Sequence, residues 1–343
     1  MTSRLSNLII DVKDLKKFFP VRRGVFRKAV AFVKAVDCIN FYIKMGETLG
    51  LVGESGCGKS TVGKSILRLM EPDEGEITFF SRQNNGKIIP KDILALNSKE
   101  LKKIKKEMQI IFQDPYSSLD PRMTIEEIIS EPMIIHKMGK ENKIKKRVEE
   151  LLEDVGLKPE HMIRYPHQFS GGQRQRIGIA RALALDPKLI ICDEPVTALD
   201  VSVQAQVLNL LNDFKKRFGF SYLLIAHDLS VIKHLSDRIA IMYLGKIVEI
   251  AENEDLFKNP KHPYTEALIS AVPITDPGRK RKKIILKGDV PSPVDPPAGC
   301  YFHPRCPYSQ SICGTVEPKF QSFEETHMVA CHFADSLELN GVK

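Results

Sequence analysis

The chain has 343 residues, of which 43% are hydrophobic and 27% charged, a composition that excludes intrinsic disorder and fits a globular protein. No uncharged apolar run approaches the ~18 residues of a membrane-spanning helix, and the N-terminus has no secretory pattern, so we expect a protein on the cytoplasmic side. The net charge of +8 is compatible with nucleic acid, but without a recognition motif we interpret the basic clusters at 13–34 and 279–283 as solvated faces.

The first 45 residues predict two strands. The segments LIIDVKDL (8–15) and CINFYIKM (38–45) alternate as strands do, and a basic connection from Pro20 to Lys34 is expected between them. Phe18 and Phe19 end the first strand. An aromatic ring at that place either stacks on a nucleotide base or belongs to the core.

The stretch GESGCGKST, which begins at residue 53, matches the phosphate-binding pattern G-x-x-x-x-G-K-[ST] without a mismatch. It follows a short apolar strand, 48–52, and precedes a helix, 61–70, so bound phosphate would lie at a helix N-terminus. Its lysine supplies charge for the β- and γ-phosphates, and the serine after it offers a hydroxyl to Mg²⁺. The residues predicted to bind nucleotide here are Gly53, Glu54, Ser55, Gly56, Cys57, Gly58, Lys59, Ser60 and Thr61.

Between this loop and the middle of the chain, the pattern predicts further strands and one basic helix. We expect a strand at 75–80, a polar loop at 81–91 and a helix at 97–107. Residues 108–112 then form an apolar strand that delivers Gln113 to its C-terminal end, where ligands bind in α/β sheets. A glutamine at this position can coordinate Mg²⁺ or orient water.

A second anion site is predicted further along the chain. Residues 124–165 show helical but no strand patterns, which indicates a helical insertion. Ser170 then caps a strongly helical run, and Gly171 and Gly172 expose backbone N–H groups at its start. Since this site is separated from the first by the helical segment, we expect it to close over a nucleotide held by another subunit.

Two later strands end in side chains suited to phosphate chemistry. The apolar strand LIICD ends at Asp193, which is placed to hold Mg²⁺, and Glu194 beside it can accept a proton from the attacking water. The strand at 222–226 ends at His227, for which we predict a γ-phosphate contact. Strands at 239–243 and 246–250 are expected to close this part as a hairpin.

GESGCGKST, Gln113, FSGGQ, LIICDEP, ALD and the His227 strand end occur in an order that resembles the ATP-binding subunit of an ABC transporter. The resemblance implies an α/β fold of the P-loop NTPase class. Its parts would be a RecA-like core (46–113 and 181–250), an N-terminal antiparallel β subdomain and a helical subdomain (about 114–180). The nucleotide-binding domain would span 1–254, followed by a C-terminal extension, 255–343.

The resemblance also assigns a role to each matched residue. Glu194 would be the catalytic base, so the chain should hydrolyse ATP. The Ser-Gly-Gly turn would contact ATP bound to the opposite subunit, and Phe19 rather than Phe18 would stack on adenine. By the same resemblance the catalytic residues are Glu194, His227 and Gln113, the Mg²⁺ ligands are Ser60, Gln113 and Asp193, and the remaining ATP contacts are Phe19, Ser170, Gly171, Gly172, Gln173 and Asp200.

Beyond residue 255, LFKNPKHPYTEALISAVP and the tail resemble the extension of oligopeptide and dipeptide importer ATPases, close to their F-type subunit. This implies a subunit that couples ATP hydrolysis to peptide uptake at the cytoplasmic face of the membrane. Its partners would be a homologous second ATPase subunit, two transmembrane permease subunits and an extracytoplasmic substrate-binding protein, with no nucleic acid. The alternatives are an importer for oligosaccharides or nickel chelates and a soluble ABC ATPase that acts on nucleic acid or ribosomes.

Four of the seven cysteines fall in the tail: Cys300, Cys306, Cys313 and Cys331. They are separated by five, six and seventeen residues, whereas structural zinc sites usually contain ligand pairs about two to four residues apart. Such wide spacing favours a [4Fe–4S] cluster over zinc or free thiols, and some relatives in the importer family carry one. Nearby histidines that could substitute as ligands are His303, His327 and His332.

Overall fold

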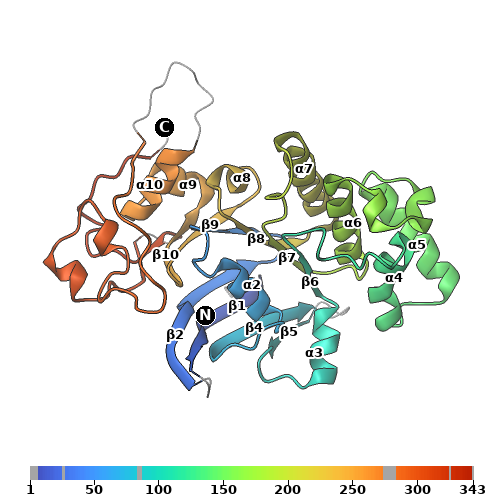
Figure 1. Cartoon of the computed structure of the whole chain (residues 1–343), viewed down its shortest axis with the longest axis horizontal. Coiled ribbons are helices and arrows are strands. Elements are labelled where there is room, and N and C mark those ends of the chain that lie inside the picture. The colour runs from blue at the N-terminus through green and yellow to red at the C-terminus, as the bar shows by residue number, and fades with distance from the viewer. Residues whose placement is uncertain (1–6, 25–27, 83–86, 273–282, 324–325, 342–343) are drawn as a thin grey trace. The chain divides into compact units, whose positions relative to one another are not determined.

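The computed structural model describes residues 7–24, 28–82, 87–272, 283–323 and 326–341 (Figure 1). The chain divides into two compact units. The first comprises residues 1–10, 43–47 and 78–225, and the second comprises 11–42, 48–77 and 226–343. The second unit therefore contains both the glycine-rich loop and the cysteine-bearing tail.

A parallel set of buried strands forms the centre of the first unit. Ile191 pairs with Ile110 on one side and with Leu223 on the other, and almost every residue of these strands is buried or nearly so. Continuous apolar sequence is what a parallel sheet covered on both faces requires. The strands are β6 (Met108–Ile111), β7 (Leu189–Asp193) and β8 (Ser221–Ala226).

Helices pack together in the rest of the first unit, where α4 contacts α5 and α6, and α6 contacts α7 (Figure 1). Capping boxes begin α4 at Thr124 and α6 at Ser170, because each N-cap hydroxyl accepts from the backbone three residues on. Buried Ile129 and Val148 contribute to the helical core. The elements are α3 (Ser98–Lys105), α4 (Ile125–Ile135), α5 (Glu141–Asp154), η1 (Pro159–Ile163), η2 (Pro166–Gln168), α6 (Gly171–Leu183) and α7 (Val201–Phe218).

The second unit contains a sheet in which β3 runs parallel to β9, and β9 turns back antiparallel into β10 (Figure 1). Leu244 and Gly245 make that turn with φ of 42° and 80°. Two short strands of the tail, β12 and β11, extend the sheet beyond β10. The strands are β3 (Thr48–Val52), β9 (Arg238–Tyr243), β10 (Lys246–Glu252), β11 (Gln321–Ser322) and β12 (Met328–Val329).

Short helices complete the second unit. Buried Leu229 and Ile232 lie on α8, and buried Leu256 and Phe257 lie on α9. The helices are α2 (Lys59–Ile66), α8 (Leu229–Lys233), α9 (Asn253–Lys258), α10 (Pro263–Ala271), η3 (His303–Arg305) and η4 (Ser311–Gly314).

Two sequence expectations about the antiparallel strands were wrong. Most of the expected connection between Pro20 and Lys34 is strand, since β1 spans Leu8–Arg23 and β2 spans Lys28–Lys44. The expected loop at 81–91 contains β5 (Ile88–Asp92), which pairs with β4 (Glu74–Arg82). Antiparallel strands can expose one face, so polar and charged side chains do not exclude them.

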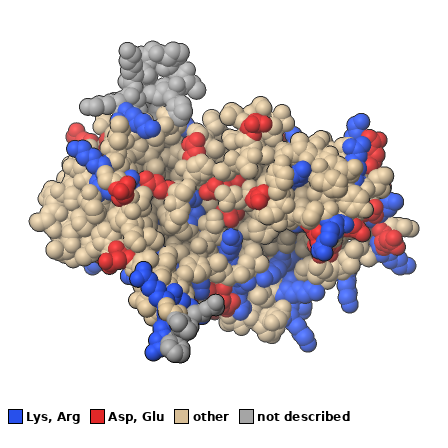
Figure 2. Space-filling view, viewed as in Figure 1, with Lys and Arg blue, Asp and Glu red and all other residues tan. Residues whose placement is uncertain are grey.

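The first basic cluster is partly neutralised by acidic side chains. Lys16 Nζ lies 2.6 Å from Glu74, and Lys17 Nζ lies 3.0 Å from Asp73. On the face shown in Figure 2, Lys and Arg side chains gather mainly along the lower part, and Asp and Glu side chains lie near several of them. These pairs favour the interpretation of a solvated face. Of the second cluster, residues 279–282 lie outside the described part of the chain.

Candidate functional site

The glycine-rich loop connects β3 to α2, as its sequence predicts. Gly58 has φ of 107°, and a Cβ there would lie 1.8 Å from the carbonyl oxygen of Ala35. A Cβ on Gly53 would lie 2.0 Å from the carbonyl oxygen of Met242. Only glycine fits both positions, so the backbone follows a path that side chains would block.

The lysine of this loop is held inside it. Lys59 is 4% exposed, and its Nζ donates to the carbonyl oxygens of Gly53 at 2.8 Å and Glu54 at 3.0 Å. Ser60 and Thr61 follow in the first turn of α2. The loop is therefore ordered around its own lysine, which is the cation predicted to bind the β- and γ-phosphates.

In the first unit, the structure brings Gln113 and Glu194 together. The Glu194 carboxylate accepts from Gln113 Nε2 and from Thr197 Oγ1, both at 3.0 Å. Glu194 is 8% exposed and has φ of 46°, and Asp193 beside it is 3% exposed at the end of β7. The two predicted catalytic side chains are thus in direct contact, and Thr197 is a partner that the sequence analysis missed.

The second predicted anion site is a solvent-facing helix start in the first unit. Ser170 Oγ accepts from the Gln173 N–H at 3.3 Å, while Gln173 Oε1 accepts from the Ser170 N–H at 3.0 Å. A Cβ on Gly172 would lie 2.4 Å from Val203 on α7. Asp200 is the N-cap residue of α7. The expected N-cap is confirmed, and the glycines let α6 and α7 approach closely.

The remaining predicted nucleotide contacts lie in the second unit. His227 is exposed and comes directly after β8. Phe19 lies on β1, is half-buried, and has Lys17 Nζ 5.6 Å from its ring centroid. A half-buried ring on this strand keeps both interpretations open, base stacking and packing.

Two contacts to the glycine-rich loop come from the tail and were not anticipated. Arg305 Nη1 donates to the Glu54 carboxylate at 2.8 Å, and the Glu54 N–H donates to Tyr264 Oη at 3.0 Å. Burial opposes the charge of Arg305, but Glu54 and Tyr243 outweigh it and raise the pKa of the guanidinium. Arg305 lies 251 residues from Glu54, so no local sequence signal could have revealed the pair.

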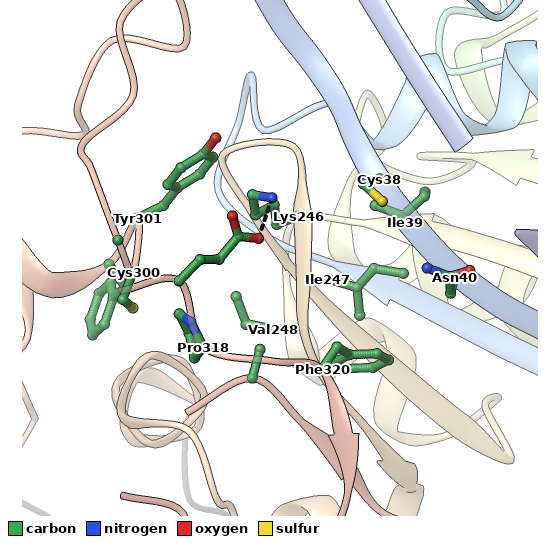
Figure 3. Close-up of a pocket in the computed structure, with 14 residues that line it drawn as sticks. Cys38, Ile39, Asn40, Lys246, Ile247, Val248, Cys300, Tyr301, Pro318 and Phe320 are labelled. Atoms are coloured by element: carbon green, nitrogen blue, oxygen red, sulfur yellow. Dashed lines mark hydrogen bonds and ion pairs between the residues drawn. The ribbon is translucent and has the colours of Figure 1, made fainter. Parts of the chain in front are cut away.

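Residues of the tail, β2 and β10 line a small pocket, and polar contacts join the tail to both strands there (Figure 3). Lys246 Nζ lies 2.7 Å from Glu317, the interaction drawn as a dashed line, and 5.0 Å from the Tyr301 ring centroid. Tyr301 Oη donates to Asp37 at 2.8 Å. These polar contacts fasten the extension to both strands.

The four tail cysteines line one cavity together with His262, Phe302, His303 and His332. Burial, with the neighbouring thiols adding to it, raises the pKa of Cys306 to about 11 and of Cys331 to about 12. Within the described residues, however, no three His, Cys, Asp or Glu side chains are arranged to hold a metal ion. The structure therefore gathers the cysteines but does not support the expected metal site.

One of the three histidines suggested as substitute ligands is engaged elsewhere. His327 is fully buried, with Nε2 2.7 Å from Glu249 and Nδ1 2.7 Å from Asp255. His303 and His332 do line the cysteine cavity. Sequence proximity suggested His327 as a ligand, but the pairing of β12 with β10 turns it to these carboxylates instead.

Comparison with known proteins places the chain in a family. Residues 36–197 match the ABC transporter model, and residues 248–313 match the model "Oligopeptide/dipeptide transporter, C-terminal region". The oligopeptide transport ATP-binding protein AppF of Bacillus subtilis is 51% identical over 97% of this chain and 99% of its own length. The putative oligopeptide transport ATP-binding protein YkfD of the same organism is 54% identical over 96% and 97%.

Solved structures agree with that placement. The ATP-binding cassette MJ0796, in a dimeric post-hydrolysis state bound to ADP and Pi, is 29% identical with a TM-score of 0.60, covering 71% of this chain and 98% of that one. CbiO1 of Clostridium perfringens, part of the ABC transporter complex cbiONQ, is 26% identical with the same TM-score over 73% and 91%. The chain belongs to the ABC transporter ATPase family, and the predicted P-loop NTPase fold is confirmed. No helix among the described residues is long and apolar enough to cross a membrane.

Proposed function

We propose that this ABC ATPase powers the import of oligopeptides or dipeptides. The observation that carries the proposal is the match of residues 248–313 to the C-terminal region of oligopeptide/dipeptide transporters, in a chain whose relatives match almost end to end. The same match is evidence against the alternative of a soluble ABC ATPase that acts on nucleic acid or ribosomes. Oligosaccharide or nickel-chelate import remains an alternative for the test.

In this proposal the chain contributes two kinds of ATP contact. The glycine-rich loop and Lys59 bind one triphosphate, and Glu194 accepts the proton of the attacking water, aligned through Gln113. His227 contacts the γ-phosphate. The turn that begins at Ser170 binds the ATP held by the paired subunit, as an exposed helix start with free N–H groups can do.

Mg²⁺ fits the donor set that the chain offers. A serine hydroxyl, a glutamine oxygen and a carboxylate are hard oxygen ligands of the kind Mg²⁺ takes beside nucleotide phosphates. We assign these roles to Ser60, Gln113 and Asp193. When bound, Mg²⁺ would neutralise charge on the phosphates, while Glu194 and Lys59 do the protein's share of proton transfer and phosphate binding.

We also propose the assembly in which the ATPase works. Its partners are a homologous second ATPase subunit, two permease subunits and an extracytoplasmic binding protein, at the cytoplasmic face of the membrane, with the chain as the F-type subunit. Large apolar side chains exposed in the helical part of the first unit support a permease contact there: Tyr116, Ile134, Ile135, Ile163 and Tyr165. The domain division at 254/255 is part of the same proposal.

Reconstitution of the transporter in liposomes tests the substrate class. The chain is combined with the second ATPase subunit and permeases encoded beside it, and their binding protein is loaded with peptide, oligosaccharide or nickel chelate. Peptide-loaded binding protein should stimulate ATP hydrolysis and peptide uptake, and Glu194→Gln should abolish both. Stimulation by another cargo alone, or by nucleic acid without membrane subunits, would refute the proposal.

A second proposal concerns the cysteines, and it rests on their shared cavity. A [4Fe–4S] cluster takes one thiolate at each of four irons, so its ligands surround a cavity instead of a single ion. We propose that Cys300, Cys306, Cys313 and Cys331 bind such a cluster, which would hold together a tail with little regular structure. Protein purified without oxygen should show visible absorbance with matching iron and acid-labile sulfide. Zinc without iron, or four free thiols, would reject the cluster.

A further inference from the structure

One residue of the phosphate-binding loop is held from outside the loop. Glu54 makes four polar contacts: its carboxylate accepts from Arg305 at 2.8 Å, its N–H donates to Tyr264 at 3.0 Å, and its carbonyl oxygen accepts from Lys59 at 3.0 Å and from the Cys57 N–H at 3.3 Å. Two of these partners belong to the extension. The extension therefore contacts both the side chain and the backbone N–H of Glu54, the residue whose carbonyl oxygen also bonds Lys59.

Arg305 is well placed to act as a rigid support. Its side chain is 8% exposed and lies in the 3₁₀ turn η3, between Cys300 and Cys306. Three backbone hydrogen bonds fix that turn, among them His303 N–H to Cys300 O at 3.0 Å and Arg305 N–H to Phe302 O at 3.0 Å. A short, hydrogen-bonded turn leaves the guanidinium few alternative positions.

Aromatic packing secures the same turn. The buried ring of Phe302 lies 5.3 Å from the ring centroids of both Tyr243 and Tyr264. Tyr264 Oη in turn accepts from Glu54. The support for the loop is thus one continuous cluster of buried aromatic rings with Arg305 at its polar edge.

The charge of Glu54 gives Arg305 a function beyond packing. A carboxylate in a phosphate-binding loop repels the triphosphate that the loop must bind, and the repulsion is strong where water is partly excluded. A buried, paired guanidinium offsets that charge and fixes the direction of the carboxylate. Without Arg305, the Glu54 carboxylate would remain in the loop and its negative charge would no longer be neutralised.

We propose that Arg305 is a positioning residue for ATP binding, through which the C-terminal extension holds the phosphate-binding loop and neutralises Glu54. The extension then sets the nucleotide affinity of the ATPase directly. The inference requires only that the chain binds ATP, and it is independent of the transported cargo and of any metal at the cysteines.

ATP affinity of the full-length chain tests this proposal, measured by equilibrium binding of a fluorescent ATP analogue with Mg²⁺. Arg305→Met should weaken binding about tenfold, the loss expected when a hydrogen bond between charged groups is removed. Arg305→Lys should recover part of the affinity. In Arg305→Met, the further change Glu54→Gln should also restore affinity, because it removes the uncompensated charge.

Lys246→Met is the matched control, because it breaks the ion pair to Glu317 that fastens the same extension but does not touch Glu54. It should leave ATP affinity unchanged while lowering the midpoint of thermal unfolding about as much as Arg305→Met does. The proposal fails if Arg305→Met binds ATP like the wild type, or if Lys246→Met weakens binding equally and Glu54→Gln brings no recovery. Wild-type protein that does not bind ATP would count against the ATPase itself.

Discussion

At the scale of a single residue, Glu194 is held in one defined position by its burial, its backbone conformation and its hydrogen bonds. It is nearly buried, it adopts a left-handed backbone conformation at φ 46°, and its N–H bonds the carbonyl oxygen of Ile225 at 3.0 Å. Such backbone conformations cost about 1–3 kcal/mol in non-glycine residues and persist where surrounding contacts impose them. Gln113 and Thr197 then fix the carboxylate itself.

Glu194→Gln should therefore keep ATP binding and lose turnover. The amide preserves size but cannot accept the proton, so phosphate release should fall by roughly 10²–10⁴-fold while affinity for ATP changes little. Thr197→Val provides the comparison, since it removes one hydrogen bond to the carboxylate and should slow hydrolysis much less. Unchanged hydrolysis in Glu194→Gln would show that another group is the base.

A comparison of two loop glycines separates backbone strain from steric exclusion. Gly56 and Gly58 both have positive φ, but a Cβ on Gly56 meets nothing within 4 Å, whereas one on Gly58 lies 1.8 Å from Ala35 O. Gly56→Ala should cost about 1–2 kcal/mol of unfolding free energy from its conformation alone. Gly58→Ala should cost clearly more, because backbone must also move. Denaturant unfolding measures both, and equal losses would contradict the geometry.

At the scale of elements, the sequence predicts buried strands better than exposed ones. The strands β7 and β8 are almost wholly apolar and were located within a residue or two. β5 was missed because it is short, polar and contains Pro90, which resembles a loop. The periodicity of hydrophobic residues reflects burial, so a short strand with mostly solvated side chains shows little of it.

The same limit applies to the site. Motifs identified the glycine-rich loop, the Ser170 cap and the strand-end carboxylates, because each function requires local residue types at fixed spacing. They could not reveal the contact of Arg305 with Glu54, which is 251 residues away in the sequence. Nor could they reveal the contact of His327 with Glu249, which is 78 residues away. Contacts of this kind depend on how the tail folds back, and no periodic pattern encodes that.

The strand β12, which lies between β10 and β11, is held by buried His327 and its carboxylate partners, and the strength of this contact should depend on pH. Burial opposes protonation of His327, but the hydrogen bonds and charges of Glu249 and Asp255 outweigh it and raise the histidine's pKa above 6.5. Phe323 packs beside the ring, and backbone N–H groups of Lys261 and His262 also donate to Glu249. The two carboxylates thus favour the imidazolium form of His327 more in the folded chain than in the unfolded one.

The sign of this effect follows from linkage. A raised pKa stabilises the folded state fully below the unfolded value of 6.5, and this contribution is lost as the pH rises through the raised pKa of folded His327. A tenfold gain in proton affinity on folding corresponds to about 1.4 kcal/mol of stability. Unfolding followed between about pH 6 and 9 should show stability falling, and His327→Gln should flatten the fall. His332→Gln, at a half-buried histidine that bonds Val316 O and neither carboxylate, should retain it. An unaltered profile in His327→Gln would contradict the assignment.

At the scale of the whole molecule, the two predicted anion sites lie in different units of the chain. The exposed helix start at Ser170 lies in the first unit, whereas the loop that holds Lys59 lies in the second. The proposed pairing, in which each of these two elements binds the phosphates of a different ATP, would let two subunits share their nucleotides.

This arrangement predicts that Ser170 acts in subunit pairing, not in binding the chain's own ATP. In the Glu194→Gln background, ATP should trap a closed pair with the second ATPase subunit, detectable by size-exclusion chromatography or cross-linking. Adding Ser170→Ala should weaken that ATP-dependent pairing by roughly tenfold, the effect of losing one hydrogen bond to a charged phosphate. Affinity of the isolated chain for ATP should stay as it was.

Loss of the cap alone could mimic this effect, since an N-cap serine or threonine stabilises its helix by about 0.5–2 kcal/mol. Thr124→Ala controls for it, because Thr124 forms the same capping box at the start of α4. Thr124→Ala should lower stability to a similar extent and leave ATP-dependent pairing intact. If both variants weaken pairing equally, Ser170 serves only its helix; if neither does, the Ser-Gly-Gly turn does not contact the partner's nucleotide.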